Sequence, residues 1–174
     1  YQLKVVQVIN GVESAEETAV SSSLEVRAHD RTGFAHMNRD TEGIFEGVGA
    51  YRNDGTLKDN AIVIYVTANN AKTITQDLQY YESDKKNIYK SYTGIGRILE
   101  GYRKCWALGK SKGFTLPALD VRIIGLLTRD EMDYLNGAGL QIKGESNATD
   151  LPITIEGVGS DATISGFGFA ISQV

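Results

Sequence analysis

The chain has 174 residues, of which 41% are hydrophobic and 23% are charged, so it can bury the core of one domain, or of one domain and part of another. A net charge of −4 argues against a general nucleic-acid binder, and a single cysteine excludes an internal disulfide framework and a zinc site built from several cysteines. No stretch approaches the roughly 18 consecutive apolar residues that a membrane-spanning helix needs. The 19 glycines against 2 prolines indicate many tight turns and a body rich in β-strands.

Residues 1–27 predict a β-hairpin. Apolar and polar residues alternate from Tyr1, and Asn10-Gly11 between apolar runs is the strongest short hairpin signal. We expect the return strand at Glu13 to Val20 and a closing piece at Leu24-Glu25-Val26. This pattern resembles the last two strands of a fibronectin type III module, and an unrelated hairpin is the alternative. Because the chain begins and ends in alternating segments, we expect it to be part of a longer protein.

Residues 28–60 are polar and rich in glycine, and Arg52-Asn53-Asp54-Gly55 has the composition of a turn. These glycines do not form a phosphate-binding loop, because the lysine and the strand–helix frame of that motif are missing. The β-branched run from Ala61 to Thr67 predicts a buried strand, and a second short strand is expected at Thr73 to Leu78.

Residues 93–109 predict the one clear helix. We expect Thr93 to be its N-cap and Gly109 or Gly113 to end it. Basic side chains dominate the opposite face, which indicates either attraction for an anionic polymer or an ordinary solvated face. The apolar stripe consists of Ile95, Ile98, Leu99, Tyr102, Cys105 and Trp106.

From residue 114 onward, short strands alternate with glycines. They are expected at Leu119–Gly125, Leu140–Gly144, Ile153–Gly157 and Ala162–Gly166, with a continuation at Phe167–Ser172. A sandwich of short strands and a parallel β-helix both give this pattern, and the spacing alone does not choose between them.

The stretch from Ile153 to Phe169, which reads ITIEGVGSDATISGFGF, resembles a signature from the early coils of pectate lyases (polysaccharide lyase family 1). Further segments match that family in the same order, and together they cover about residues 32–174. The glycine-rich segment among them is less dense in glycine than the family pattern. These segments are Gly33-Phe34-Ala35, Gly47-Val48-Gly49-Ala50-Tyr51, Ile64-Tyr65-Val66-Thr67 and Val121-Arg122-Ile123-Ile124-Gly125.

The resemblance implies that residues 28–174 are the early coils of a right-handed parallel β-helix, closed at its N-terminal end by the helix at 93–109. It also implies a secreted or cell-surface enzyme that cleaves pectate (polygalacturonate) by β-elimination. In the family, Ca²⁺ bridges acidic residues and the substrate carboxylate, and an arginine is the base. The alternative is a non-catalytic, carbohydrate-binding β-helix or adhesin. Neither implies a nucleic-acid partner or a membrane span.

We assign no catalytic and no metal-binding residue, and the substrate-binding residues are unknown, because the family's calcium ligands and arginine lie on coils after the signature strand. The fragment itself is therefore expected to be inactive. Cys105 on the apolar stripe predicts a core residue, and Asn147-Ala148-Thr149 is a glycosylation sequon or a chance match in a polar turn. Four carboxylates could be metal ligands but are more typical of turns and surfaces: Asp120, Asp130, Glu131 and Asp133. His29 and His36 form no catalytic pattern.

Overall fold

The computed structural model describes residues 4–9, 12–20, 49–52, 56–82, 85–137, 139–148 and 150–173. The chain divides into two compact units, Tyr1–Met37 and Asn38–Val174. In the first unit, β1 (Lys4–Ile9) and β2 (Val12–Val20) pair antiparallel, which confirms the predicted hairpin. The expected turn at Asn10-Gly11 and the closing piece at Leu24-Glu25-Val26 lie outside the described residues.

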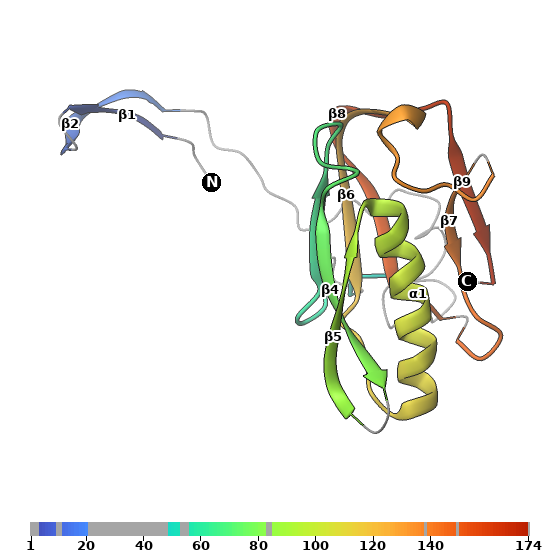
Figure 1. Ribbon diagram of the computed structural model, residues 1–174. Helices are drawn as coiled ribbons and strands as arrows, with labels where there is room; N and C mark the ends of the chain where they lie inside the picture. Colours follow the sequence, from blue (N-terminus) through green and yellow to red (C-terminus); the bar gives the residue numbers. More distant parts are fainter. Residues whose placement is uncertain are drawn as a thin grey trace, which may run out of the picture. The chain divides into compact units, whose positions relative to one another are not determined.

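The second unit is built on two parallel sheets (Figure 1). One has the strand order β3 (Ile62–Val66), β6 (Leu119–Thr128) and β8 (Ile153–Ser165), and the other pairs β7 (Gly139–Lys143) with β9 (Gly168–Ser172). From β6 onward the chain therefore visits the two sheets alternately, and β8 and β9 each pair with the previous strand of their own sheet. This confirms the prediction in its coarse form, a mostly β protein with parallel strands.

The three-stranded sheet has one apolar face and one polar face, because side chains alternate along a strand. On the apolar face, Ile64 and Val66 of β3 are buried beside Val121 and Ile123 of β6. The run from Ala61 to Thr67 is thus a strand as predicted, but it is buried on one side only, and Tyr65 is 48% exposed on the other.

The strand β8 corrects one prediction. The segments Ile153–Gly157 and Ala162–Gly166 were expected to be separate strands, but β8 continues through both. Its pairing with β6 shifts register between Ile124 and Leu126, and a positive φ of 86° at Gly159 lets the chain bend there. Glycine adopts this backbone conformation without a steric penalty, so the bend does not end the strand.

The helix α1 (Ile95–Lys112) buries every residue of the predicted apolar stripe. The expected N-cap is wrong, because Thr93 belongs to the preceding strand and Gly94 is the N-cap, whereas Gly113, one of the two glycines expected to end the helix, is its left-handed C-cap. The basic side chains of this face are largely paired with nearby carboxylates, as on an ordinary solvated face. The pairs are Arg97 and Lys104 with Glu100, Arg103 with Glu145, and Lys110 with Asp150.

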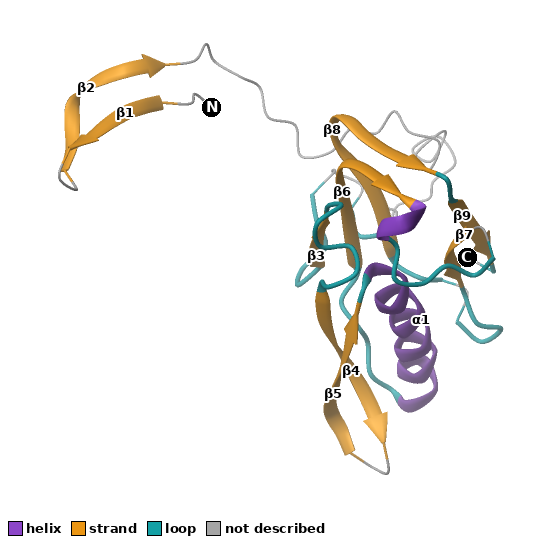
Figure 2. Ribbon diagram, turned by 45° about the horizontal axis from the view of Figure 1, so that its top comes forward, coloured by secondary structure: helices purple, strands orange, loops and turns teal. Residues whose placement is uncertain are grey.

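An antiparallel hairpin lies alongside α1 (Figure 2). It consists of β4 (Thr75–Glu82), which was expected in part as Thr73 to Leu78, and β5 (Lys85–Thr93), which was not expected. The alternation in β5 is masked by its lysines and asparagine, so the sequence gives only a weak strand signal there. Among the described residues, no helix is long and apolar enough to cross a membrane.

Candidate functional site

The parallel register lines up polar residues on the outer face of the three-stranded sheet. Residues that pair across the sheet form two neighbouring rows, because alternate positions on each strand share a face. The first row is Val63, Asp120 and Thr154, and the second is Tyr65, Arg122 and Glu156.

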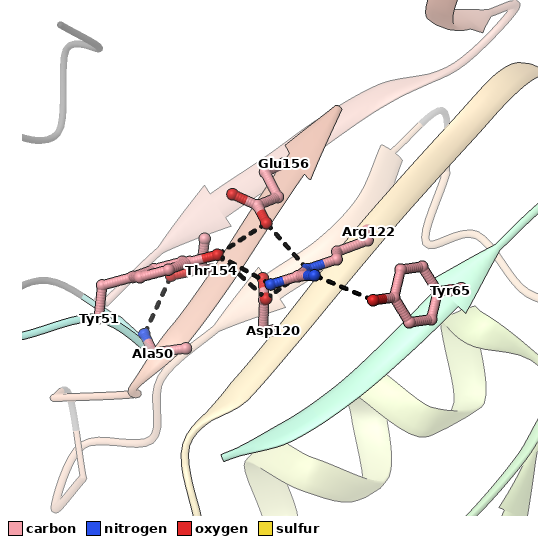
Figure 3. Close-up of polar contacts among 7 residues, drawn as sticks. All are labelled: Ala50, Tyr51, Tyr65, Asp120, Arg122, Thr154 and Glu156. Carbon is pink, nitrogen blue, oxygen red and sulfur yellow. Dashed lines mark hydrogen bonds and ion pairs between the residues drawn. The ribbon is translucent and has the colours of Figure 1, made fainter. Parts of the chain in front are cut away.

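Arg122 lies at the centre of this polar cluster (Figure 3). Its Nε is 2.8 Å from Oδ2 of Asp120 and 3.0 Å from Oε1 of Glu156. Its two terminal nitrogens donate to the hydroxyls of Tyr65 at 3.0 Å and Tyr51 at 3.2 Å. One guanidinium thus joins all three strands of the sheet to the segment before β3.

Residues 49–52 of that segment, the covering segment, lie over the first row. Tyr51, which is 3% exposed, donates its hydroxyl to Oε1 of Glu156 at 2.8 Å and lies 3.3 Å from Oδ2 of Asp120. The backbone N–H of Ala50 donates to Oγ1 of Thr154 at 3.0 Å. Gly49 has a φ of 56°, and a Cβ there would lie 2.3 Å from the same Oγ1, so only glycine allows this close approach.

Asp120 provides a fully buried carboxyl in the polar cluster. Asp120 is 0% exposed, and its Oδ1 has no hydrogen-bond partner among the described residues. Burial raises the pKa of this carboxyl and outweighs the opposite effect of Arg122. Burial also raises the pKa of the Tyr51 hydroxyl far above its usual value.

Arg122 behaves differently because it is only partly covered, with 22% of its side chain exposed. Burial alone would lower the pKa of its guanidinium, but the hydrogen bonds to Asp120 and Tyr51 reverse this effect and raise it. Arg122 is therefore a permanent cation and is unsuited to act as a base. It can hold carboxylates and orient phenols.

The polar cluster does not fit a calcium ion. Ca²⁺ needs six to eight oxygen ligands, whereas the guanidinium of Arg122 lies between the two carboxylates that would have to provide them, Asp120 and Glu156. In the part of the chain that the structure describes, no group of three or more His, Cys, Asp or Glu side chains could hold a metal ion. We therefore derive no chemical step through calcium at these residues.

The four candidate carboxylates do not come together. Asp120 belongs to the polar cluster, while Asp130 and Glu131 lie in the short 3-10 helix η2 (Arg129–Glu131), where Glu131 accepts the backbone N–H of Thr128. Asp133 accepts two backbone N–H groups at the start of α1. All but Asp120 thus serve turns and a helix end, in agreement with the structural interpretation.

The remaining candidates have simple outcomes. Cys105 is 0% exposed, burial raises the pKa of its thiol, and its sulfur lies 3.7 Å from the hydroxyl of Tyr92, which confirms a core residue. Asn147 is exposed in a tight turn. His29 and His36 lie outside the described residues.

Sequence reasoning missed five members of the polar cluster: Tyr51, Tyr65, Arg122, Thr154 and Glu156. A signal existed, because Asp120 and Arg122 alternate with apolar residues in one strand and Thr154 and Glu156 do so in another. Charged residues at alternate positions of two mostly apolar strands indicate a shared polar face, once the register is known.

Comparison with known proteins finds no match to this chain among protein families, curated proteins or solved structures.

Proposed function

We propose that the chain is the N-terminal portion of a secreted, pectate lyase-like β-helix that acts on polygalacturonate. The observation that carries this proposal is the strand order. The chain runs through β6, β7, β8 and β9, and β8 pairs parallel with β6 while β9 pairs parallel with β7. Two successive coils of a right-handed β-helix would give this pairing, with β3 as a strand of the coil before them.

The two ends of this stack differ in a way that supports the proposal. The apolar stripe of α1 is buried, and the helix packs against β7 and the β4–β5 hairpin, so it can serve as the expected cap. At the other end, β8 and β9 are the last strands of their sheets. Phe169 and Ile171 of β9 are 41% and 62% exposed, which suits a surface on which a further coil stacks.

The polar cluster has a supporting role in this proposal. Its arginine is neither a base nor part of a calcium site, so the family's elimination chemistry is assigned to residues other than those described. The cluster instead fixes the covering segment to the outer face of the sheet. Tyr65 beside Arg122 leaves an aromatic ring and a cation at the surface, a combination suited to a carboxylated sugar.

A non-catalytic, carbohydrate-binding β-helix or adhesin is the second candidate. It is favoured by the full engagement of Arg122, Asp120 and Glu156 with one another, which leaves no free acid–base pair in the cluster. Both candidates share the fold and the substrate class, and they differ in whether product forms.

The deciding experiment follows ultraviolet absorbance of unsaturated uronate when polygalacturonate is mixed with the complete protein that carries these residues. The lyase proposal expects absorbance to rise with Ca²⁺ and to stop when a chelator is added. Retention on immobilised polygalacturonate without any absorbance change would support the binding protein instead. If the protein neither forms product nor is retained, both candidates are overturned.

The fold itself is tested by cross-linking across the second sheet. With Cys105 replaced by serine, Gln141→Cys and Ala170→Cys place two thiols at directly paired positions of β7 and β9. Oxidation is expected to join them, because paired positions lie within the Cα separation that a disulfide spans. The control pair Lys143→Cys and Ala170→Cys is shifted along the strand and should remain reduced. Equal oxidation of both pairs would contradict the register.

A further inference from the structure

A hollow of about 320 Å³ lies at the C-terminal end of α1, away from the residues of the polar cluster. Its volume falls within the roughly 300–1,000 Å³ typical of small-molecule sites. Two of its lining residues are aromatic, one is cationic and two are glycines. The lining consists of Trp106, Gly109, Lys110, Gly113, Phe114 and Thr115.

Two of these side chains already hold a carboxylate. Nζ of Lys110 lies 2.6 Å from Oδ2 of Asp150, and Nε1 of Trp106 donates to Oδ1 of the same residue at 3.3 Å. The two donors are four residues apart on α1, so they share one face of the helix. Together they form a two-point carboxylate holder whose geometry comes from the helix alone.

The bound carboxylate is exchangeable. The side chain of Asp150 is 62% exposed and that of Lys110 is 42% exposed, and an ion pair in water contributes only about 0–1 kcal/mol. The hydrogen bond from Lys110 lowers the pKa of Asp150, so the position favours an ionised carboxylate. A carboxylate from outside the chain, attached to a group that also fills the hollow, gains contacts that Asp150 lacks.

The rest of the hollow suits a sugar ring. The half-buried ring of Phe114 offers apolar surface to the C–H groups of a pyranose, whereas Trp106 is 7% exposed and contributes its indole N–H. The exposed side chain of Thr115 also lines the hollow, and its hydroxyl can exchange hydrogen bonds with sugar hydroxyls. Nζ of Lys110 lies over the Trp106 ring, 4.9 Å from its centre, so the cation stays beside the hollow.

We infer that this hollow is an ancillary binding site for a hexuronate residue, whose carboxylate replaces that of Asp150 on Lys110 and Trp106. The ligand class rests on the proposed function, but the site is separate from any catalytic centre. It would hold an acidic polysaccharide at the capping helix.

Trp106 is the only tryptophan of the chain, so intrinsic fluorescence reports on this site directly. The whole chain is titrated with galacturonate, with galactose and acetate as matched arms that carry only the ring or only the carboxylate. A saturable fluorescence change is expected with galacturonate and none with the other two at the same concentrations. An equal response to galactose or acetate, or no response to galacturonate, would overturn the inference.

Two substitutions are expected to shift the affinity in opposite directions. Lys110→Gln should weaken galacturonate binding by up to about fivefold, because the exposed ion pair that it removes contributes about 0–1 kcal/mol. Asp150→Asn should tighten it several-fold by removing the internal competitor. Lys112→Gln is the control, since that ammonium lies 5.2 Å from the Tyr81 ring and does not line the hollow.

Opposite shifts distinguish a ligand site from a purely structural contact. If the Lys110–Asp150 pair only stabilises the fold, the two substitutions should act in the same direction, on stability and not on affinity. That result would overturn the inference. If the complete protein forms lyase product but galacturonate causes no fluorescence response, this site is refuted and the proposed function stands. If galacturonate causes the response but no product forms, this site stands and the lyase proposal is refuted.

Discussion

Asp133 caps the helix α1 by accepting the backbone N–H of Gly96 on Oδ1 at 2.8 Å. Its second oxygen, Oδ2, accepts the N–H of Arg97 at 3.0 Å. The N-cap position itself is Gly94, which has no side chain to offer, so the carboxylate comes from the segment after η2. The helix α1 is thereby tied to the chain that follows β6.

Removal of this carboxylate should destabilise the protein. We expect Asp133→Ala to lower the free energy of unfolding by about 1 kcal/mol, since two N–H groups lose their acceptor and the helix dipole loses a favourable charge. Urea denaturation followed by circular dichroism measures the change. Asp130→Ala alters an exposed carboxylate of η2 and should have little effect, so equal losses in both variants would argue against the capping role.

The hydroxyl of Tyr51 is expected to matter more than that of Tyr65, although both accept a hydrogen bond from Arg122. Tyr51→Phe leaves the buried carboxyl of Asp120 with one contact fewer, at a cost of about 1–3 kcal/mol. In Tyr65→Phe, Arg122 loses an acceptor that water can replace. We therefore expect the free energy of unfolding to change by less than about 0.5 kcal/mol. Chemical denaturation of the two variants gives the comparison. A larger loss for Tyr65→Phe would contradict the arrangement of the polar cluster.

Local patterns predict much of this fold. The stripe from Ile95 to Trp106 has helical spacing and is buried throughout. The β-branched run at Ile62–Val66 is a strand, and so is Gly139–Lys143, which was expected at Leu140–Gly144. These elements follow from side-chain periodicity, which is a property of neighbouring residues. Their pairing was predicted only through the family resemblance, since parallel partners are separated by long stretches of chain.

The candidate site could not be predicted because it depends on register. Tyr51, Arg122 and Glu156 lie far apart in the sequence and meet only when β8 aligns with β6 and the covering segment folds over both. The helix cap was missed for the same reason. Thr93 has the chemistry of an N-cap, but β5 extends through it, and the distant Asp133 takes over that role.

The buried carboxyl of Asp120 predicts a specific pH dependence. Its pKa in the folded state is raised by burial, so folding favours the protonated form and this contribution to stability is complete below the unfolded-state pKa. The contribution is lost as pH rises through the folded-state pKa, from about pH 4 upward. Relative to Asp120→Asn, the parent protein should therefore become less stable as pH increases.

Denaturant titrations of both proteins at several pH values isolate this effect. Glu100 and Asp150 have lowered pKa values, chiefly because Lys104 and Lys110 donate hydrogen bonds to them, and they act in the opposite direction. Both residues are present in the parent and in the variant, so their effect cancels in the difference. A stability difference that stays constant or reverses sign across this range would contradict a raised pKa for Asp120.

A charge placed on the buried stripe of α1 should disrupt the packing of this helix against the strands, and with it the proposed cap. Leu99 is 2% exposed, and Leu99→Asp would place an unpaired carboxylate among apolar residues and remove the packing that holds the helix against the β-strands. Even Leu→Ala at such a site costs about 2–5 kcal/mol, so the aspartate variant should expose apolar surface and aggregate. Size-exclusion chromatography is the measurement, with Ser111→Asp on the exposed side of α1 as the control. Because both variants add one negative charge to the same helix, aggregation of Leu99→Asp alone would follow from burial, whereas a soluble, monomeric Leu99→Asp would refute the capping role of α1.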